Sequence, residues 1–153
     1  MKSASERVGA LDWPAVTQQL DALGCASTGM LLRPVECAEL RALYREEARF
    51  RSTVDMARHR FGEGEYRYFA HPLPELVAEL RAAFYPQLLP IARAWAERLG
   101  RPAPWPDDFE DWLAQCHDAG QKRPTPLLLA TSRAAGTRST ATCTASSFSR
   151  CRS

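Results

Sequence analysis

The sequence predicts an α+β fold: a mostly helical amino-terminal part with a β-hairpin, followed by a disordered tail. In several segments of residues 1–129, apolar residues recur at the three- and four-residue spacing of amphipathic helices. Residues 53–71 instead alternate apolar and polar positions around a glycine-containing centre, as a hairpin does. Residues 130–153 contain no Leu, Ile, Val, Met, Trp, Asp or Glu, so they lack most of the side chains that build a core.

Charge gives little support for binding to nucleic acid by the body of the chain. The formal net charge is +2, from 20 Lys and Arg against 18 Asp and Glu. The tail contributes four arginines and no acid, so residues 1–129 have 16 basic and 18 acidic residues. Net charge of this size constrains association weakly, and local clusters of arginine remain open as contact sites.

Composition also predicts a cytoplasmic protein without membrane contact. The start, MKSASERVG, has no apolar signal-peptide region, and no apolar run approaches the ~20 residues that cross a bilayer. The five cysteines are odd in number, irregularly spaced and without a C-x-x-C motif. This usage is typical of reduced thiols and not of a disulfide framework.

The first predicted elements are two helices with a short strand between them. LDWPAVTQQLDALG predicts a helix with Asp12 as N-cap, Pro14 in the first turn and Gly24 after its end. Residues 29–32 are apolar between helix breakers and predict a strand. Residues 34–50 predict the second helix, with acids near its amino end and one apolar face formed by Cys37, Leu40, Leu43 and Tyr44.

The remaining elements are a hairpin, three helices and a final strand. In TVDMARHRFGEGEYRYFAH, Val54 and Met56 alternate with polar residues, as do Tyr66 and Tyr68 after the glycines. PELVAELRAAF and PQLLPIARAWAERLG predict two helices separated by Pro86. DDFEDWLAQCHDAG predicts a helix, and TPLLL, residues 125–129, predicts a strand. The expected inward residues of that last helix are Phe109, Trp112, Leu113 and Cys116.

No catalytic or metal-binding residue can be assigned from the sequence. The histidines His59, His71 and His117 form no H-x-D or H-x-x-x-H pair. Cys116, His117 and Asp118 are adjacent, but neighbouring helical side chains point about 100° apart and do not converge on one ion. We expect a buried cysteine beside two exposed polar residues. Cys116 and His117 have no third group to orient them for nucleophilic catalysis, and the sequence contains no G-x-S-x-G motif.

The hairpin sequence RHRFGEGEYRYF supports two interpretations. Its arginines and aromatic residues could contact phosphates and stack on bases, which gives a candidate contact surface. Alternatively, the aromatic side chains pack inward and the arginines lie in solvent. The residues of the candidate contact surface are Arg58, Arg60, Tyr66, Arg67 and Tyr68.

Two segments of residues 27–129 are distinctive, RHRFGEGEYRYFAHPLP and CHDAGQKRPTPLLL. Through them the chain resembles the amino-terminal half of a bacterial family of Fe(II)- and 2-oxoglutarate-dependent oxygenases of the nucleic-acid type. The resemblance implies that the helical part supports a double-stranded β-helix, or jelly roll, whose core is missing here. It also implies two histidines and a carboxylate on iron, with a basic residue for 2-oxoglutarate. No residue after Leu129 matches, so no ligand is carried over.

The tail is interpreted as an out-of-frame translation. Codons for residues 130–151, read from the third base of each, permit Y-V-P-G-G-W-N-A-L-H-R-D-L-Y-G-E-L-V-F-P-L. This reading resembles the family's continuation and includes an H-x-D pair, although most positions allow several amino acids. The alternative is an ordinary disordered tail that acts as a weak basic binding segment.

These observations predict two domains: a helical oxygenase portion, 1–129, and a disordered, out-of-frame tail, 130–153. We expect a truncated dioxygenase relative that binds neither Fe(II) nor 2-oxoglutarate in this form. The full-length family would oxidise a nucleic acid or a protein substrate. The alternative is a small helical module that binds protein or nucleic acid. Exposed apolar surface on the fragment also predicts self-association.

Overall fold

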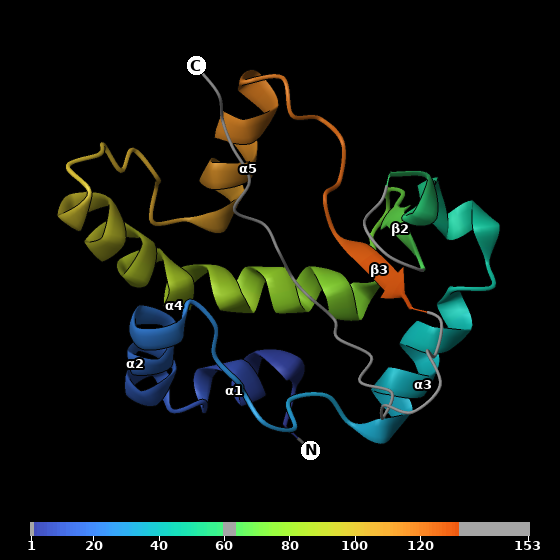
Figure 1. The fold of residues 1–153 in the computed structure, drawn as a ribbon, viewed down its shortest axis with the longest axis horizontal. Coiled ribbons are helices and arrows are strands. Elements are labelled where there is room, and N and C mark those ends of the chain that lie inside the picture. The colour runs from blue at the N-terminus through green and yellow to red at the C-terminus, as the bar shows by residue number, and fades with distance from the viewer. Residues whose placement is uncertain (1, 60–63, 132–153) are drawn as a thin grey trace. The chain divides into compact units, whose positions relative to one another are not determined.

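The computed structural model describes residues 2–59 and 64–131 (Figure 1). The chain divides into two compact units. The first comprises residues 1–36 and 75–122, and the second comprises residues 37–74 and 123–153. The predicted α+β class is confirmed, since helices combine with a three-stranded antiparallel sheet. The predicted tail falls almost entirely on residues 132–153, which lie outside the described residues.

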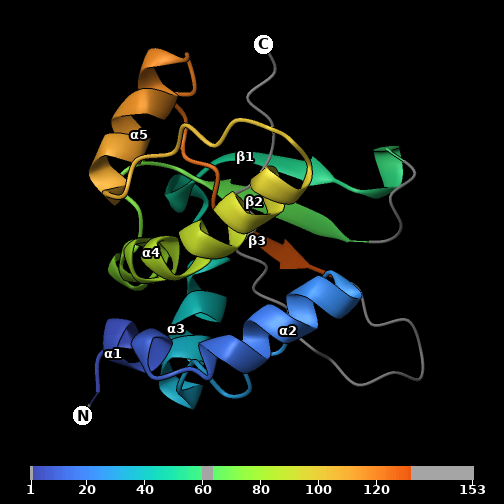
Figure 2. The same ribbon diagram turned by 90° about the vertical axis from the view of Figure 1, so that its left-hand side faces the viewer.

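The first unit is built around one long helix. α4 (Glu75–Arg98) lies between α1 (Ala4–Gly9) and α2 (Trp13–Leu23) on one side and α5 (Phe109–Asp118) on the other, as both ribbon views show (Figures 1 and 2). Its core is formed by buried side chains from all four helices. These are Ala4, Val8, Val16, Tyr85, Leu89, Ile91, Ala96 and Cys116.

The helix α1 was not expected from the sequence, although the sequence contains its start signal. Ser3 accepts a hydrogen bond from the Glu6 backbone, and the Glu6 carboxylate accepts one from the Ser3 backbone. This reciprocal pair is a capping box, whose S-x-x-E pattern is visible in residues 3–6. The backbone N–H of Ser5 also donates to Glu79 of α4, at 2.8 Å.

The predicted first helix is confirmed as α2, but the prediction of a strand after it is wrong. Asp12 caps α2 by accepting from the Ala15 backbone, and Gly24 ends it with a left-handed φ of 72°. Residues 29–32 form no strand: Gly29 has φ 68°, and its carbonyl accepts from the Leu31 N–H in a tight turn. Met30 is 95% exposed, so this apolar run has no sheet against which to pack.

The two helices expected on either side of Pro86 are one continuous helix, α4. Both Pro86 and Pro90 lie inside it. Each proline removes one N–H from the helical ladder, which leaves the carbonyls of Ala82 and Pro86 without that donor. Ala82, Pro86 and Pro90 are four residues apart and all exposed, so water can satisfy these carbonyls. Burial of the opposite face keeps the helix continuous.

The predicted helix near residue 110 is confirmed as α5. Asp108 caps it by accepting from the backbone of Glu110 and Asp111. Cys116 is buried while His117 and Asp118 are exposed, as expected.

The proline-rich segment before α5 is held against α4. Tyr85 donates to the Pro106 carbonyl at 2.7 Å, and its ring stacks with that of Trp112 at 6.4 Å. Arg93 pairs with Asp107 at 2.7 Å, so a segment without regular structure has fixed contacts to the helix.

The helix α3 (Pro34–Leu43) contains the boundary between the units and is shorter than predicted. It ends seven residues before Phe50; a 3₁₀ turn, Glu47–Arg49, then leads into strand β1 (Phe50–Asp55). The residues after Leu43 are good helix formers, but Phe50 stacks on Phe69 at 5.0 Å across the sheet. This tertiary pairing overrides the local helical preference.

The second unit contains the sheet, in the order β1-β2-β3 (Figure 2). The predicted hairpin is confirmed: β1 pairs antiparallel with β2 (Glu65–Phe69), and the connection includes a 3₁₀ turn, Ala57–His59. The predicted final strand is also confirmed as β3 (Leu127–Ala130), displaced by two residues at its start. β3 pairs antiparallel with β2, so the described sheet is centred on β2.

Candidate functional site

The candidate site is the sheet of the second unit, whose two faces differ in character. Successive residues of a strand point to opposite faces, so Glu65, Arg67 and Phe69 lie on one face of β2 and Tyr66 and Tyr68 on the other. Paired residues on neighbouring strands share a face. Thus Leu128 and Ala130 join the Arg67 face, while Ser52, Val54, Leu127 and Leu129 join the tyrosine face.

The Arg67 face carries a compact polar cluster of Tyr44, Glu65 and Arg67. The Tyr44 hydroxyl donates to Glu65 at 2.5 Å, and Arg67 donates to the same Glu65 oxygen from Nε at 3.0 Å. The guanidinium also donates to the Tyr44 carbonyl at 3.0 Å. It lies 4.4 Å from the Tyr44 ring centroid and 5.8 Å from that of Phe50. Arg67 is therefore held between aromatic rings and a carboxylate.

The cluster shifts the ionisation of its members in directions that preserve it. Burial, followed by the hydrogen bond to Glu65, raises the pKa of Tyr44 to about 12. The hydrogen bond from Tyr44, followed by that from Arg67, lowers the pKa of Glu65. Near neutral pH Tyr44 is therefore a donor and Glu65 an acceptor. The cluster is a structural ion pair with its hydrogen bonds satisfied, and it holds no free nucleophile.

The tyrosine face carries aromatic side chains that contact one another and an arginine. Tyr66 and Tyr68 meet edge to face, with ring centroids 5.6 Å apart, and both are half-buried. The Arg51 guanidinium lies 4.4 Å from the Tyr68 ring centroid, and its Nε donates to the Pro124 carbonyl at 3.1 Å. Arg51 thus links the edge strand to the segment that leads into β3. It was not among the residues of the candidate contact surface.

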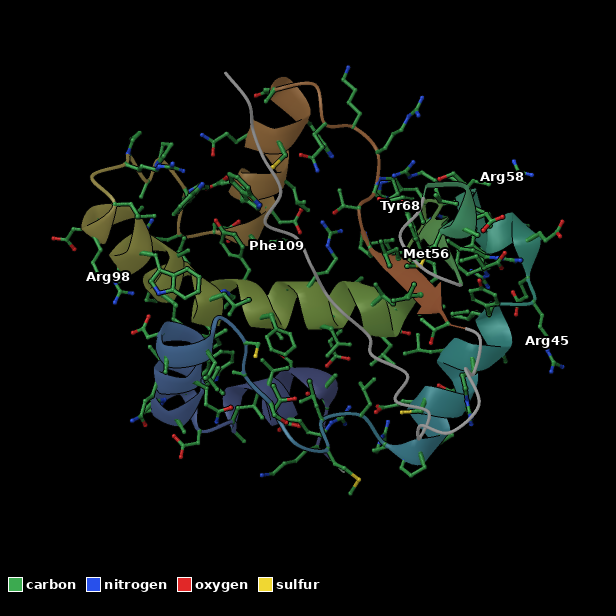
Figure 3. The ribbon with its side chains drawn as sticks, viewed as in Figure 1. Arg45, Met56, Arg58, Tyr68, Arg98 and Phe109 are labelled. Atoms are coloured by element: carbon green, nitrogen blue, oxygen red, sulfur yellow. The ribbon has the colours of Figure 1, made fainter. Side chains whose placement is uncertain are left out.

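The five residues proposed from the sequence do not form one surface. Arg58 is exposed at 83% of its side chain, with a loose 3.7 Å contact to Asp55, and it extends away from the sheet (Figure 3). Tyr66 and Tyr68 lie on the tyrosine face. Arg67 points to the opposite face, and Arg60 lies outside the described residues.

The expectation that the hairpin arginines lie in solvent is wrong for Arg67. Its side chain is only 18% exposed, because the ring of Tyr44 and the carboxylate of Glu65 enclose it. The sequence pattern predicts Tyr44 on the apolar face of a helix and gives no role to Glu65. Their one signal in the sequence is the Glu65–Arg67 spacing, which places opposite charges on one strand face.

A second charged cluster in the first unit stabilises the start of α3. Glu36 is 5% exposed and accepts from Arg7 at 2.8 and 2.9 Å and from the Arg33 side chain at 2.6 Å. Arg7 also donates to the Leu31 carbonyl at 2.9 Å. Hydrogen bonding from Arg33 opposes burial and lowers the pKa of Glu36 to about 2. The acid expected near the start of this helix is therefore also bound by two arginines.

No metal site is present among the described residues. Within residues 2–59 and 64–131, no three His, Cys, Asp or Glu side chains lie close enough to hold an ion. His71 and His117 are exposed and belong to different units. These donors therefore do not fit the iron centre that the resemblance implies.

In the same part of the chain, no helix combines the length and the apolar character needed to cross a membrane.

Comparison with known proteins indicates a relationship to oxygenases. Residues 64–135 match the model of the Oxygenase-NA family, which is described as an oxygenase catalysing oxidative methylation of damaged DNA. The chain is therefore related to an oxygenase family through the segment that contains β2, α4, α5 and β3.

Two proteins of Mycobacterium tuberculosis match part of the chain. They are the uncharacterised proteins Rv2227 of strain H37Rv and MT2286 of strain CDC 1551. Each is 57% identical over 61 residues, which is 40% of this chain and 26% of the mycobacterial protein. The match thus spans about a quarter of the length of these relatives. No solved structure matches the chain.

Proposed function

We propose that residues 27–129 are the amino-terminal part of an Fe(II)- and 2-oxoglutarate-dependent oxygenase whose reading frame is lost after Leu129. In this proposal the 153-residue chain does not turn over 2-oxoglutarate, whereas the in-frame protein does. The observation that carries it is the oxygenase-family match over residues 64–135, which stops six residues after Leu129.

The family match ends within the first six residues of the segment whose composition has changed, and it covers only the beginning of that segment. The described helices and strands end with β3 at Ala130, and residues 131–153 contain none of the Leu, Ile or Val side chains that a jelly roll would require. The shifted reading contains His-Arg-Asp shortly after the strand position, where an H-x-D pair would supply two of the three iron ligands. An ordinary polar tail does not account for this reading.

Iron chemistry is not assigned to the present chain. The described carboxylates with lowered pKa are Asp21, Glu36 and Glu65; each is held by arginine, and none is grouped with a histidine. A 2-His-1-carboxylate face needs three ligands that converge and leave positions open for cosubstrate and oxygen. No reaction step is therefore derived through these residues.

Sequencing of the source gene across codons 125–155 is the first test. An inserted or missing base that restores Y-V-P-G-G-W-N-A-L-H-R-D would support the proposal. An unchanged sequence with no such alternative frame would overturn it.

The second test compares the 153-residue chain with the frame-corrected protein. Both are incubated with Fe(II), ascorbate, 2-oxoglutarate and alkylated single-stranded DNA, since the family description names damaged DNA. We expect succinate release only from the corrected protein. Succinate from the short chain above a metal-free control would contradict the proposed inactivity. If neither protein responds, uncoupled 2-oxoglutarate turnover without DNA separates a wrong substrate from an absent iron centre.

A second candidate function is binding of single-stranded nucleic acid by the tyrosine face. It is favoured by the half-exposed rings of Tyr66 and Tyr68 with Arg51 stacked beside them. Base stacking on such rings contributes roughly 1–3 kcal/mol per base. Fluorescence anisotropy with oligothymidylate at increasing salt tests it. Affinity that survives Tyr68→Ala but disappears when residues 132–153 are removed, which leaves β3 whole, would assign binding to the tail instead.

A further inference from the structure

The strand β3 is one edge of the sheet that the structure describes. Phe69 N–H donates to the Pro126 carbonyl at 3.0 Å, so this pair lies in the hydrogen-bonded position of the ladder. Hydrogen-bonded and non-hydrogen-bonded pairs alternate between antiparallel strands. In the register of β2 and β3, Leu128 and Ala130 therefore face β2, while the N–H and C=O groups of Leu127 and Leu129 face outward.

We propose that a second copy of this chain pairs with β3 along this outer edge, β3 against β3 and antiparallel. The inference does not depend on the oxygenase proposal, because it uses only the described sheet. An antiparallel pair of identical strands is compatible with two-fold symmetry, since each strand presents the same groups to the other. β3 contains three leucines and an alanine and no charge, so two copies meet without like-charge repulsion.

The opposite edge of the sheet explains why this pairing stops at a dimer. β1 has an irregular register between Phe50 and Ser52, and Arg51 and Asp55 on this strand are charged and exposed. A bulge and charged residues are devices that discourage edge-to-edge pairing. β3 has neither device. A chain with one open edge and one protected edge forms a closed pair and not a fibre.

The composition of the chain favours β3 of a second copy, and not the chain's own tail, as the strand that pairs with the outer edge of β3. A strand added beside Leu127 and Leu129 extends both faces of the sheet and needs apolar, β-favouring side chains. After Ala130 the sequence supplies Phe148 as its only large apolar residue. A second β3 supplies three leucines in four residues.

Light scattering after size exclusion, over a dilution series of the full chain, measures the assembly. We expect a mass that falls from dimer to monomer on dilution. Leu129→Pro removes an outward N–H and should give the monomer at every concentration, because proline is tolerated on an edge whose N–H does not bond within the sheet. Leu129→Ala removes more side-chain bulk than Leu129→Pro but keeps the N–H, and it should still dimerise.

Amide hydrogen exchange followed by NMR keeps the proposal testable if Leu129→Pro does not fold. Leu127 and Leu129 amides of the unmodified chain should exchange more slowly as concentration rises, while Leu128, which faces β2, should be protected throughout. A monomer at all concentrations, or a folded Leu129→Pro variant that still dimerises, would overturn the proposal. Protection of Leu129 that does not change with dilution would also overturn it, since the chain's own residues would then cover the edge.

Discussion

The backbone carbonyl of Ala130 lies where a side chain on Gly64 would have to be. A Cβ built on Gly64 would be 2.6 Å from the Ala130 oxygen and 3.1 Å from the Thr131 Cα. The φ of Gly64 is 136°, a conformation that L side chains rarely adopt. The glycine that precedes β2 therefore allows the end of β3 to approach it.

Gly64→Ala should weaken the pairing of β2 with β3. Backbone strain alone costs roughly 1–3 kcal/mol, and the carbonyl is main chain and cannot rotate away as a side chain would. We expect a lower free energy of unfolding in urea and faster amide exchange in Leu128 and Ala130. Gly120→Ala is the matched control, because Gly120 has φ 90° with open space around it. Equal losses in the two variants would show that the close approach does not matter.

Tyr44→Phe should raise the pKa of Glu65, since the hydrogen bond from Tyr44 is the largest influence that lowers it. The aromatic ring remains beside Arg67, so the change isolates the hydroxyl. We expect a loss of about 1 kcal/mol in unfolding free energy, as for one hydrogen bond to a partly exposed charge. NMR titration of the Glu65 carboxyl group measures the shift.

Tyr66→Phe provides the comparison for this prediction. Tyr66 is on the same strand but on the opposite sheet face, so its hydroxyl should not influence Glu65. A pKa of Glu65 that moves equally in both variants, or in neither, would argue against the cluster.

The sequence predicts those elements whose signals are local. The Asp12 cap, Pro14 and Gly24 define α2 within a few residues, and the alternation around the glycines defines the hairpin. Ser3 and Glu6 carried an equally local signal for α1. Elements of this kind depend on neighbours three or four residues away, which a sequence displays directly.

Other features depend on contacts between distant residues and could not be predicted. α4 continues through Pro86 because its opposite face is buried, and α3 ends early because Phe50 pairs with Phe69. The position of Arg67 is a similar case: Tyr44 approaches it from the turn after α3, 23 residues away. The residues next to Arg58 and Arg67 in the sequence do not show that Arg58 is exposed and Arg67 is enclosed.

Glu36 should make folding stability depend on pH in the acid range. Its pKa falls from 4.5 to about 2 on folding, so its contribution is present above pH 4.5 and is lost as the pH falls toward 2. Glu36→Gln should therefore be less stable than the parent chain at pH 7, with the difference narrowing between pH 4.5 and 2. Urea unfolding at several pH values measures this.

The exposed Glu39, on the same helix, supplies the control for the Glu36 experiment. Glu39→Gln should follow the pH dependence of the parent chain. A difference between the parent chain and Glu36→Gln that stays constant from pH 7 to 2 would mean that the carboxylate of Glu36 gains nothing from Arg7 and Arg33.

Pro86→Ala should stabilise the protein, because Pro86 lies in the interior of α4 and is exposed. Alanine supplies an N–H for the Ala82 carbonyl and loses no buried contact. Proline in a helix interior is about 3 kcal/mol less favourable than alanine, although its removal frees the unfolded chain by roughly 0.4–1 kcal/mol. We expect a net gain of about 1–2 kcal/mol in the free energy of unfolding, measured in urea, because the helix around the proline has already adjusted to it in part.

Pro102→Ala, in the exposed segment before α5, is the control and should change stability slightly in the opposite direction. A loss in Pro86→Ala as large as that in Pro102→Ala would mean that α4 already satisfies the Ala82 carbonyl within the protein.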